Sequence, residues 1–263
     1  MKQVFFSDVD GTLLAHRQKM PNTVRDTAIE YQRRGGQLVL CTGRSEKSLR
    51  PVVETLAITL PCIVCCGAGI YDFQAAQYLW RARFPIGIHE RLRGVLDEYP
   101  SIAVQAFTTD DIYTLSMNRQ LAERGILLEQ EDGIRTAHEI QGELLKLLLV
   151  CEDVDLLHRC RSTYFSGDDY TVEAASTHFT EVTPVGVDKG VAAKRFLQML
   201  KLEDALICAA GDGRTDLPLL QEANLRFAPK NAKPELQAIC DYVVPAAEEG
   251  GMATAFSIAA ERM

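Results

Sequence analysis

The chain has 263 residues, and its 28 Lys plus Arg against 36 Asp plus Glu give a formal net charge of -8. A hydrophobic fraction of 47% with 24% charged residues is typical of a folded globular protein and excludes disordered, collagen-like and coiled-coil chains. The acidic balance predicts no nucleic-acid partner. No apolar run approaches the roughly 20 residues that span a bilayer, so we expect a cytoplasmic protein with no membrane partner.

The first third of the chain alternates short apolar runs with helical periodicity, which predicts β-α-β units and a parallel sheet. Gly35-Gly36 ends the first helix, and Ser45 caps the second. The expected elements are, in order, a strand over Val4–Ser7, a helix over Thr23–Arg34, a strand over Gln37–Cys41, a helix with Leu49, Val52, Val53 and Leu56 on its inner face, and a third strand over Pro61–Cys66.

From about Arg83 to Thr183 the pattern changes. Two short apolar runs flank the turn-like Thr109-Asp110-Asp111, which indicates a hairpin. The expected elements here are strands over Ala103–Phe107, Ile112–Ser116, Leu144–Cys151, Tyr170–Ala174 and Phe179–Val182, and a helix over Val154–Tyr164. We therefore predict an inserted α+β domain over residues 83–183.

After the insert the first pattern returns. The expected elements are a helix from Asp188, a strand over Ala205–Ala210, a helix over Leu217–Ala223, a strand over Leu225–Ala228, a helix over Ala232–Cys240 and a strand over Tyr242–Val244. The predicted fold class is α/β, with a Rossmann-like parallel sheet and helices on both faces formed by residues 1–82 and 184–263.

Two acids separated by one residue, Asp8 and Asp10 in Asp8-Val9-Asp10-Gly11-Thr12, follow the first strand directly. A lone Asp-Gly pair would indicate only a turn. Two carboxylates at the carboxyl end of a buried strand point toward the edge where ligands of such sheets bind.

This segment resembles the first motif of the haloacid dehalogenase superfamily, phosphatase type. The resemblance implies that Asp8 is a nucleophile that attacks phosphorus and that Asp10 is the general acid and base. The chemistry is consistent, because a carboxylate can split one displacement into formation and hydrolysis of an acyl phosphate, and a nearby acid can protonate the leaving oxygen and then activate water.

Two further segments resemble later motifs of that family. Cys41-Thr42-Gly43-Arg44 follows the second strand, and the resemblance implies that Thr42, with Gly43 beside it, binds a phosphoryl oxygen. Without the other motifs, such a segment would indicate only a helix cap. Lys189 resembles the cation that neutralises charge between nucleophile and phosphate. A lysine at a helix N-terminus opposes the helix dipole, which favours a specific anionic partner over a solvated side chain.

Gly211-Asp212-Gly213-Arg214-Thr215-Asp216 resembles the fourth motif, whose acids bind Mg²⁺. The resemblance implies metal binding by the Asp8 carboxylate, the Asp10 backbone carbonyl and Asp212, with Asp216 behind them. Hard oxygen ligands of this kind suit Mg²⁺. The family usually has Asn where this chain has Thr215, which affects one predicted hydrogen bond.

The resemblance extends to the end of the chain and indicates the Cof-like branch with a type IIB cap. Asn231, followed by Glu249-Gly250-Gly251, resembles the closing segment and is expected to bind phosphate. Cys66 stands where the branch commonly has Asn near the substrate. The cap normally selects the leaving group, and His178, Phe179 and Glu181 are candidates that an exposed hairpin would explain equally well.

The cysteines offer a competing interpretation. Cys62, Cys65 and Cys66 could form a metal or redox site, but no second Cys or His pair stands at zinc spacing. Several others, such as Cys41, Cys151 and Cys208, lie in apolar runs where Cys acts as a small hydrophobe. We expect reduced, buried thiols.

The expected function is a Mg²⁺-dependent phosphatase that acts on a small phosphomonoester, with a sugar or sugar alcohol phosphate as the first candidate and pyridoxal phosphate, other small phosphates and nucleotides behind it. A phosphomutase needs the same nucleophile and metal and stays open. A phosphate sensor would have little use for Asp10, and no Gly-x-Gly-x-x-Gly follows the first strand to favour dinucleotide binding. The oligomeric state is not predicted.

Overall fold

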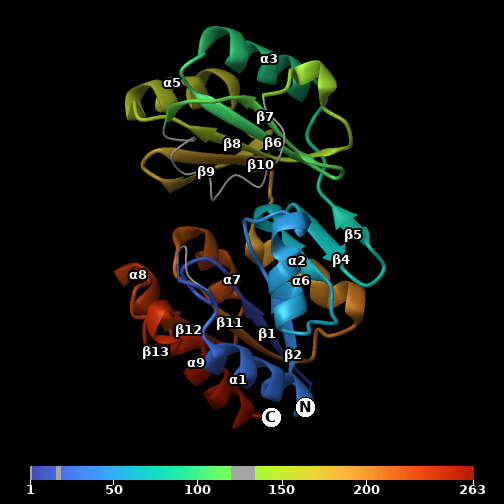
Figure 1. Ribbon diagram of the computed structural model, residues 1–263, viewed down its shortest axis with the longest axis vertical. Coiled ribbons are helices and arrows are strands. Elements are labelled where there is room, and N and C mark those ends of the chain that lie inside the picture. Colours follow the sequence, from blue (N-terminus) through green and yellow to red (C-terminus); the bar gives the residue numbers. More distant parts are fainter. Residues whose placement is uncertain (1, 16–18, 120–133) are drawn as a thin grey trace. The chain divides into compact units, whose positions relative to one another are not determined.

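The chain folds into two compact units (Figure 1). The computed structural model describes residues 2–15, 19–119 and 134–263. Unit 1 consists of Met1–Trp80 and Asp188–Met263, and unit 2 consists of Arg81–Val187.

Unit 1 contains a five-stranded sheet of order β13-β12-β11-β1-β2. All neighbouring strands in it run parallel. Its strands are β1 (Gln3–Ser7), β2 (Gln37–Leu40), β11 (Leu206–Ala210), β12 (Leu225–Pro229) and β13 (Tyr242–Val244). The parallel sheet predicted from the alternating pattern is confirmed.

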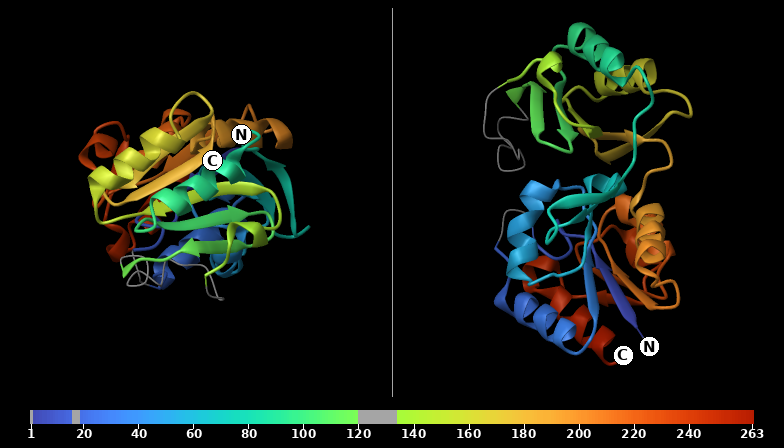
Figure 2. Two further views of the ribbon diagram at one scale, coloured as in Figure 1. Left: turned by 90° about the horizontal axis from the view of Figure 1, so that it is seen from above. Right: turned by 90° about the vertical axis from the view of Figure 1, so that its right-hand side faces the viewer.

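Helices cover both faces of this sheet, as predicted. On β1, Phe6 contacts Phe196 of α6 (Lys189–Leu200) edge-on, with ring centroids 5.5 Å apart. The side chain before it, Phe5, points to the opposite face and packs on Tyr31 of α1 (Asn22–Arg33) and Phe256 of α9 (Gly251–Ala260). The alternation of a strand therefore sends consecutive aromatic residues into two separate halves of the core. Helices α1 and α9 lie side by side (Figure 2).

The helices of unit 1 begin largely where the sequence predicts. They are α1 (Asn22–Arg33), α2 (Glu46–Thr55), α6 (Lys189–Leu200), α7 (Leu217–Gln221), α8 (Pro234–Gln237) and α9 (Gly251–Ala260). The side chain of Ser45 accepts a hydrogen bond from the backbone N–H of Ser48, and that of Asp188 accepts one from Val191. Both polar caps satisfy donors that a helix start leaves without partners.

The third predicted strand, Pro61–Cys66, is wrong in extent, and its expected place in the parallel sheet is reduced to one isolated parallel bridge between Cys41 and Ile63. Strand β3 covers Cys62–Val64 and belongs to a separate three-stranded sheet of order β3-β4-β5, in which it runs antiparallel to β4. The other two strands are β4 (Gly69–Asp72) and β5 (Gln77–Arg81). The chain turns back after β3 because Cys65 and Cys66 have left-handed backbone angles, with φ of 51° and 59°. An apolar run alone does not reveal such a turn.

Two helices at the end of the chain differ from expectation. The helix expected over Ala232–Cys240 is confined to α8, Pro234–Gln237, because Pro234 suits only the first turn of a helix and no intrahelical hydrogen bond can reach back beyond it. Helix α9 was not predicted at all. Its sequence is apolar on nearly every side, so it lacks the periodicity by which a half-exposed helix is identified.

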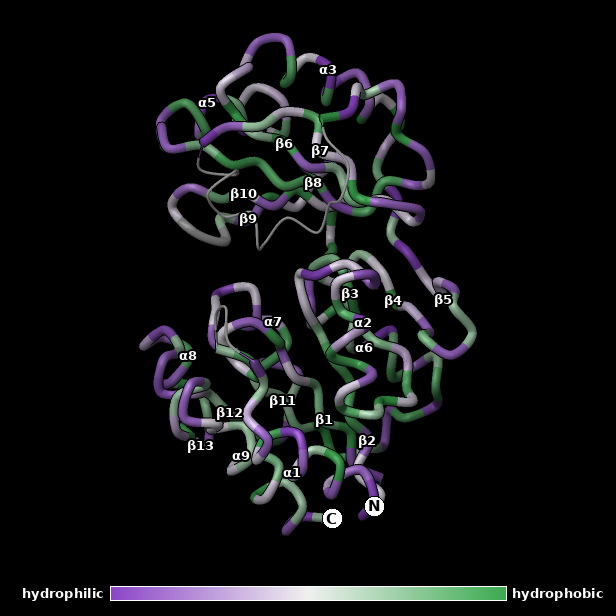
Figure 3. The backbone as a smooth tube through the Cα atoms, in the orientation of Figure 1, coloured by the Kyte–Doolittle hydropathy of each residue, from purple (hydrophilic) through white to green (hydrophobic). Residues whose placement is uncertain are grey.

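The described residues of unit 2 form an antiparallel sheet of five strands, order β7-β6-β8-β10-β9, and the two α-helices α3 and α5. The elements are α3 (Ile88–Glu98), β6 (Ala103–Thr108), β7 (Ile112–Ser116), β8 (Leu144–Val150), α5 (Val154–Tyr164), β9 (Tyr170–Ser176) and β10 (Phe179–Pro184). Helix α3 was not predicted, although Ile88, Leu92 and Val95 are buried at helical spacing. Most of β8 is coloured hydrophobic in Figure 3, consistent with its burial in the middle of the sheet.

Within the described ranges, no helix has the length and apolar content that crossing a membrane requires.

Candidate active site

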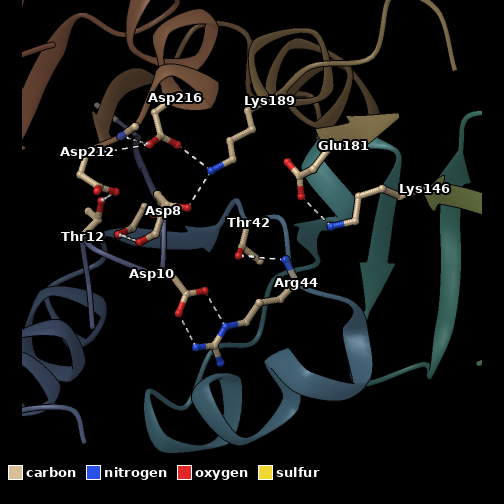
Figure 4. Close-up of polar contacts among 12 residues, drawn as sticks. Asp8, Asp10, Thr12, Thr42, Arg44, Lys146, Glu181, Lys189, Asp212 and Asp216 are labelled. Atoms are coloured by element: carbon tan, nitrogen blue, oxygen red, sulfur yellow. Dashed lines mark hydrogen bonds and ion pairs between the residues drawn. The ribbon is translucent and has the colours of Figure 1, made fainter. Parts of the chain in front are cut away.

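The predicted site residues of unit 1 gather at the carboxyl end of its parallel sheet (Figure 4). Asp8 and Asp10 follow β1, and Thr42 follows β2. Asp212 and Asp216 follow β11, and Asn231 follows β12, while Lys189 is the first residue of α6. Strands that run parallel end at one edge, so residues more than 200 positions apart meet there.

Lys189 joins two of the predicted acids. Its Nζ lies 2.6 Å from Oδ1 of Asp8 and 2.6 Å from Oδ1 of Asp216. The three side chains are 3%, 7% and 2% exposed, respectively. Charges this deeply buried are tolerated only when they are paired. Even then their burial lowers the free energy of unfolding, and a function would explain why the cluster is kept.

The electrostatics of the cluster follow from burial and from its excess of acid. Burial raises the pKa of Asp8 well above its usual value, an effect that Lys189 opposes and the neighbouring Asp216 and Asp212 reinforce. Burial by itself would lower the pKa of Lys189, but the Asp216 and Asp8 carboxylates outweigh it and raise that pKa above its usual value. The lysine therefore carries a positive charge beside the Asp8 carboxyl group at neutral pH.

Asp216 fixes its neighbours by using both carboxylate oxygens. Oδ1 binds Lys189, and Oδ2 accepts hydrogen bonds from the backbone N–H groups of Asp212 at 3.0 Å and Gly213 at 2.9 Å. Asp212 in turn accepts a hydrogen bond at Oδ1 from the hydroxyl of Thr12, at 3.1 Å. Asp216 thus holds the backbone of the Asp212 loop, and its predicted place behind the metal ligands stays a prediction.

Gly11 is required by the close approach of the loop after β1 to Asp212. Its φ is +89°, and a Cβ at this position would lie 2.4 Å from Oδ2 of Asp212. Any other residue would have to adopt a strained backbone and displace the carboxylate. The Asp-Gly pair is therefore a turn, and it is also the contact that brings two acid-bearing loops together.

Asp8, Asp212 and Asp216 form a group that could hold a metal ion, because each offers a carboxylate oxygen and these oxygens lie within 4.8 Å of one another. When all are charged, three carboxylates and the Lys189 ammonium leave a net charge of -2, which a divalent cation neutralises. Oxygen-only donors fit a hard cation such as Mg²⁺ or Ca²⁺.

The alternative cysteine site receives no support. Cys62, Cys65 and Cys66 are buried and outside any disulfide among the described residues, where the group that could hold a metal ion is the one formed by the three carboxylates. Burial raises the pKa of Cys62 to about 12, which keeps this thiol protonated and unreactive.

Asp10 points away from this cluster, toward Arg44. The guanidinium Nε donates to Oδ2 of Asp10 at 2.7 Å, and Nη2 donates to Oδ1 at 2.6 Å. This bidentate pair was not anticipated, although Arg44 belongs to the Thr-Gly-Arg segment. The signal that could have identified it was the presence of an arginine beside an acidic strand end, a place where guanidinium groups bind carboxylates in pairs of hydrogen bonds.

Thr42 is buried and lies in the loop that follows β2. Its hydroxyl oxygen accepts a hydrogen bond from the backbone N–H of Arg44 at 3.2 Å, which directs the hydroxyl proton elsewhere. A hydroxyl held in this way can donate to an anion. Gly43, half-buried, lies between these two residues.

Asn231 crosslinks two backbone segments. Its Nδ2 donates to the carbonyl oxygen of Gly11 at 2.6 Å, and its Oδ1 accepts from the N–H of Ala247 at 2.8 Å. With both ends of the amide engaged in this way, the side chain stabilises the loop after β1. The phosphate contact expected from the sequence stays a prediction.

The residues considered in the insert make contacts within unit 2. Glu181 accepts a hydrogen bond from Lys146 at 2.8 Å, and Phe179 is buried in a small cluster with Ala103 and Val150. Nδ1 of His178 lies 3.2 Å from the carbonyl oxygen of Cys151. These contacts give the three side chains a structural role in the sheet of unit 2.

Comparison with known proteins gives consistent matches along nearly the whole chain. A family model described as haloacid dehalogenase-like hydrolase matches residues 5–256. YkrA of Bacillus subtilis is 27% identical over 261 residues, which are 97% of this chain and 96% of that protein. The 5-amino-6-(5-phospho-D-ribitylamino)uracil phosphatase YcsE of the same organism is 25% identical over 248 residues, or 94% and 92% of the two chains.

The fold also matches solved structures. The crystal structure of a haloacid dehalogenase-like hydrolase from Bacteroides thetaiotaomicron aligns with a TM-score of 0.88 and 21% identity, covering 98% of this chain and 99% of that one. At this identity the match concerns the fold.

Proposed function

Because the chain belongs to the haloacid dehalogenase-like hydrolase family, in which its relatives are phosphatases, we propose that it is a Mg²⁺-dependent enzyme that hydrolyses a small sugar or sugar alcohol phosphate through an aspartyl-phosphate at Asp8. The chain is a phosphoric monoester hydrolase. The observation that carries the finer proposal is the buried cluster of Asp8, Lys189, Asp212 and Asp216.

Asp8 is the proposed nucleophile. It is buried beside Lys189 at the carboxyl edge of the sheet. Little water solvates its carboxylate there, and the positive charge of the lysine lies against one of its oxygens. An oxygen of Asp8 attacks phosphorus, the bond between phosphorus and the leaving oxygen breaks, and an acyl phosphate forms. A water oxygen then attacks phosphorus, which releases inorganic phosphate and regenerates the carboxylate.

Mg²⁺ is the proposed cofactor, held by the carboxylates of Asp8 and Asp212 and by the backbone carbonyl of Asp10. Asp216 would lie behind these ligands and hold Lys189 and the Asp212 loop in place, since its oxygens already accept from Lys189 and from two backbone N–H groups. When bound, the ion would neutralise charge on the phosphoryl oxygens. The excess of acid over base in the cluster and its hard oxygen donors support a divalent cation.

Asp10 is the proposed general acid and base. In the first step its carboxyl group gives a proton to the leaving oxygen, and in the second its carboxylate takes a proton from the attacking water. Its place two residues after the nucleophile, on the same loop, supports this role.

Lys189 and Thr42 are the proposed phosphoryl-binding groups. Lys189 orients the carboxyl group of Asp8 and neutralises negative charge as the phosphoryl group is transferred. The Thr42 hydroxyl, whose oxygen accepts from the N–H of Arg44, donates its proton to a phosphoryl oxygen. Such groups act mainly by position and charge, as phosphoryl transfer requires.

The substrate class is proposed from the relatives. The name of YcsE specifies a phosphate on a ribityl chain, which is a sugar alcohol. We propose that the leaving group here is also a primary alcohol of a polyol. All the proposed catalytic side chains lie in unit 1, so we propose that the insert, predicted from the sequence as residues 83–183, is a cap that selects the leaving group.

A screen of phosphomonoesters tests the proposal. The purified protein is incubated with Mg²⁺ and a panel of sugar, sugar alcohol, pyridoxal and nucleotide phosphates, and inorganic phosphate is measured. We expect multiple turnovers without any acceptor other than water, loss of activity in excess chelator, and no activity in Asp8→Asn. Phosphate transfer that requires a second alcohol would favour a mutase, and full activity in chelator would remove the metal from the mechanism.

A further inference from the structure

Arg44 stands apart from the other cations of the site because of what it binds. Lys189 contacts the proposed nucleophile, whereas Arg44 contacts the proposed general acid and base through two parallel hydrogen bonds of 2.7 Å and 2.6 Å. A guanidinium fork fixes both oxygens of a carboxylate and therefore the plane in which it lies. A lysine, with one nitrogen, fixes neither the plane nor the second oxygen.

The backbone of Arg44 is itself held in place. Its N–H donates to the hydroxyl of Thr42 at 3.2 Å, and its carbonyl oxygen accepts from the N–H of Cys65 at 2.8 Å. The guanidinium Nη1 lies 3.5 Å from the carbonyl oxygen of Ser48 in α2. Cys65 and Cys66 keep left-handed backbone angles, which persist only where surrounding contacts fix them.

Asp10 needs such an anchor. Its side chain is 31% exposed, and it is followed by Gly11 with φ of +89°, so burial does not by itself restrict the carboxylate to one direction. A general acid must present one oxygen to the leaving group within hydrogen-bonding distance, and small misplacements are costly in rate.

We propose that Arg44 is the positioning residue for Asp10: its guanidinium sets the direction of the carboxylate that exchanges a proton with the leaving oxygen. This inference rests on the proposed function, in which Asp10 is the general acid and base. It assigns to Arg44 no contact with the phosphoryl group or with the substrate.

The leaving group distinguishes this role from a general structural one. A p-nitrophenolate leaves without a proton, because its conjugate acid is much stronger than an aliphatic alcohol. A residue that acts through the general acid therefore matters for the first step, cleavage of the ester, with alkyl phosphates and little with p-nitrophenyl phosphate, whereas the second step, hydrolysis of the acyl phosphate, is the same for both. A residue that supports the fold, the metal or the phosphoryl group matters equally for both.

The test compares Arg44→Lys with wild type on p-nitrophenyl phosphate and on the aliphatic phosphate that the screen finds to be hydrolysed fastest. In single turnovers that report release of the leaving group, we expect the rate constant for the aliphatic ester to fall by about 10- to 100-fold and that for the aryl ester by less than about 3-fold, with KM little changed, since general acid catalysis contributes up to about 10⁴-fold. Asp10→Asn should show the same asymmetry, and the double variant should be no slower than Asp10→Asn alone.

Arg81→Lys is the matched control. Arg81 binds Glu143 of unit 2 with hydrogen bonds of 2.6 Å and 2.7 Å, and the two side chains are 34% and 41% exposed, against 27% and 31% for Arg44 and Asp10. The lysine substitution removes the same fork in both places. In Arg81→Lys we expect the ratio of the two single-turnover rate constants to equal that of wild type.

Three kinetic outcomes would overturn the inference: equal losses on both esters in Arg44→Lys, a rise in KM as the main effect, or losses that multiply in the double variant. If wild type hydrolyses no phosphomonoester, the proposed function fails, and crystal structures of wild type and Arg44→Lys then decide the positioning role. A carboxylate of Asp10 that turns away while Asp8, Lys189 and Asp216 stay in place supports it, and an unchanged carboxylate overturns it.

Discussion

The two units each contain a buried lysine bound to carboxylate, and the two clusters differ in their balance of charge. In unit 1, Lys189 binds Asp8 and Asp216, and Asp212 lies close enough to share a metal ion with them. In unit 2, Lys146 binds Glu181 at 2.8 Å, and its Nζ lies 4.3 Å from the ring centroid of Phe107. The exposed fractions of the lysine side chains are 3% and 4%.

This difference separates a cluster built for chemistry from a pair that stabilises a sheet. Lys146 and Glu181 have equal and opposite charges, and such a pair can remain buried without any ligand. The unit 1 cluster has more carboxylate groups than ammonium groups. Burial raises the pKa of Asp8, and the neighbouring Asp216 and Asp212 raise it further. A group of this kind gains stability when a cation binds, and perturbed acids of this kind are typical of active sites.

The largest expected effect is on turnover, and it separates the carboxylates of the two clusters. Asp8→Asn should lower kcat by about 10⁴-fold or more, because an amide cannot form the acyl phosphate. Glu181→Gln should change kcat for p-nitrophenyl phosphate by less than about 5-fold, since we place Glu181 outside the reaction. Phosphate release measured in parallel checks both. Similar losses in the two variants would show that the contrast between the clusters is false.

The next effect separates the carboxylates within unit 1. Asp212→Ala should lower activity by about 100-fold or more and recover partly at high Mg²⁺, because the residue mainly sets metal affinity. Asp216→Ala should lose as much without recovery, because it also releases Lys189 and the backbone N–H groups of Asp212 and Gly213. Activity against Mg²⁺ concentration distinguishes them, and equal recovery would place both directly on the metal.

Exchanging the two lysines for methionine compares the clusters directly. Lys189→Met should lower kcat by about 100- to 1,000-fold, as expected on removal of one group that stabilises charge in the transition state.

Lys146→Met should act mainly on stability, at about 3–5 kcal/mol, because it leaves Glu181 buried without its partner. The double variant Lys146→Met, Glu181→Leu should recover most of that loss. Denaturant unfolding and assays on p-nitrophenyl phosphate provide the two measurements. If Lys146→Met were stable and inactive, the pair in unit 2 would belong to the chemistry.

The smallest effect is on the stability of the metal-free protein. Asp8 has a folded-state pKa above its usual 3.8, so the folded state binds more protons than the unfolded state, and stability should fall as pH rises from 3.8 through the folded pKa. Asp8→Asn removes that dependence. In excess chelator at pH 8 we expect its unfolding midpoint to be about 2–4 °C higher than that of wild type. Thermal scans with Mg²⁺ should reverse this order, and a less stable metal-free variant would contradict the account of the cluster.

Much of unit 1 could be predicted from the sequence, because its strands and helices have distinct periodicities. The strand before Asp8, the cap at Ser45 and the start of the helix at Asp188 all lie where expected. The failures have particular causes. Helix α9 is apolar on nearly every side, and the run at Cys62–Cys66 conceals a turn that depends on left-handed residues. Periodicity reports a boundary between water and core, so it gives little signal where an element has few polar residues to mark its exposed side.

The sequence by itself determined which chemical groups the proposed active site contains and which strand ends and helix start carry them. Asp8, Asp10, Thr42, Lys189 and Asp212 follow from motif order and from the rule that parallel strands present their carboxyl ends at one edge.

Only the tertiary structure decided how those groups are shared. The structure places Lys189 between Asp8 and Asp216, engages both ends of the Asn231 amide with backbone, and pairs Asp10 with Arg44. The physical reason is that a hydrogen bond depends on distances of a few tenths of an ångström. Such distances are set by how strands, loops and helices from distant parts of the chain pack together, and no local pattern of residues encodes them.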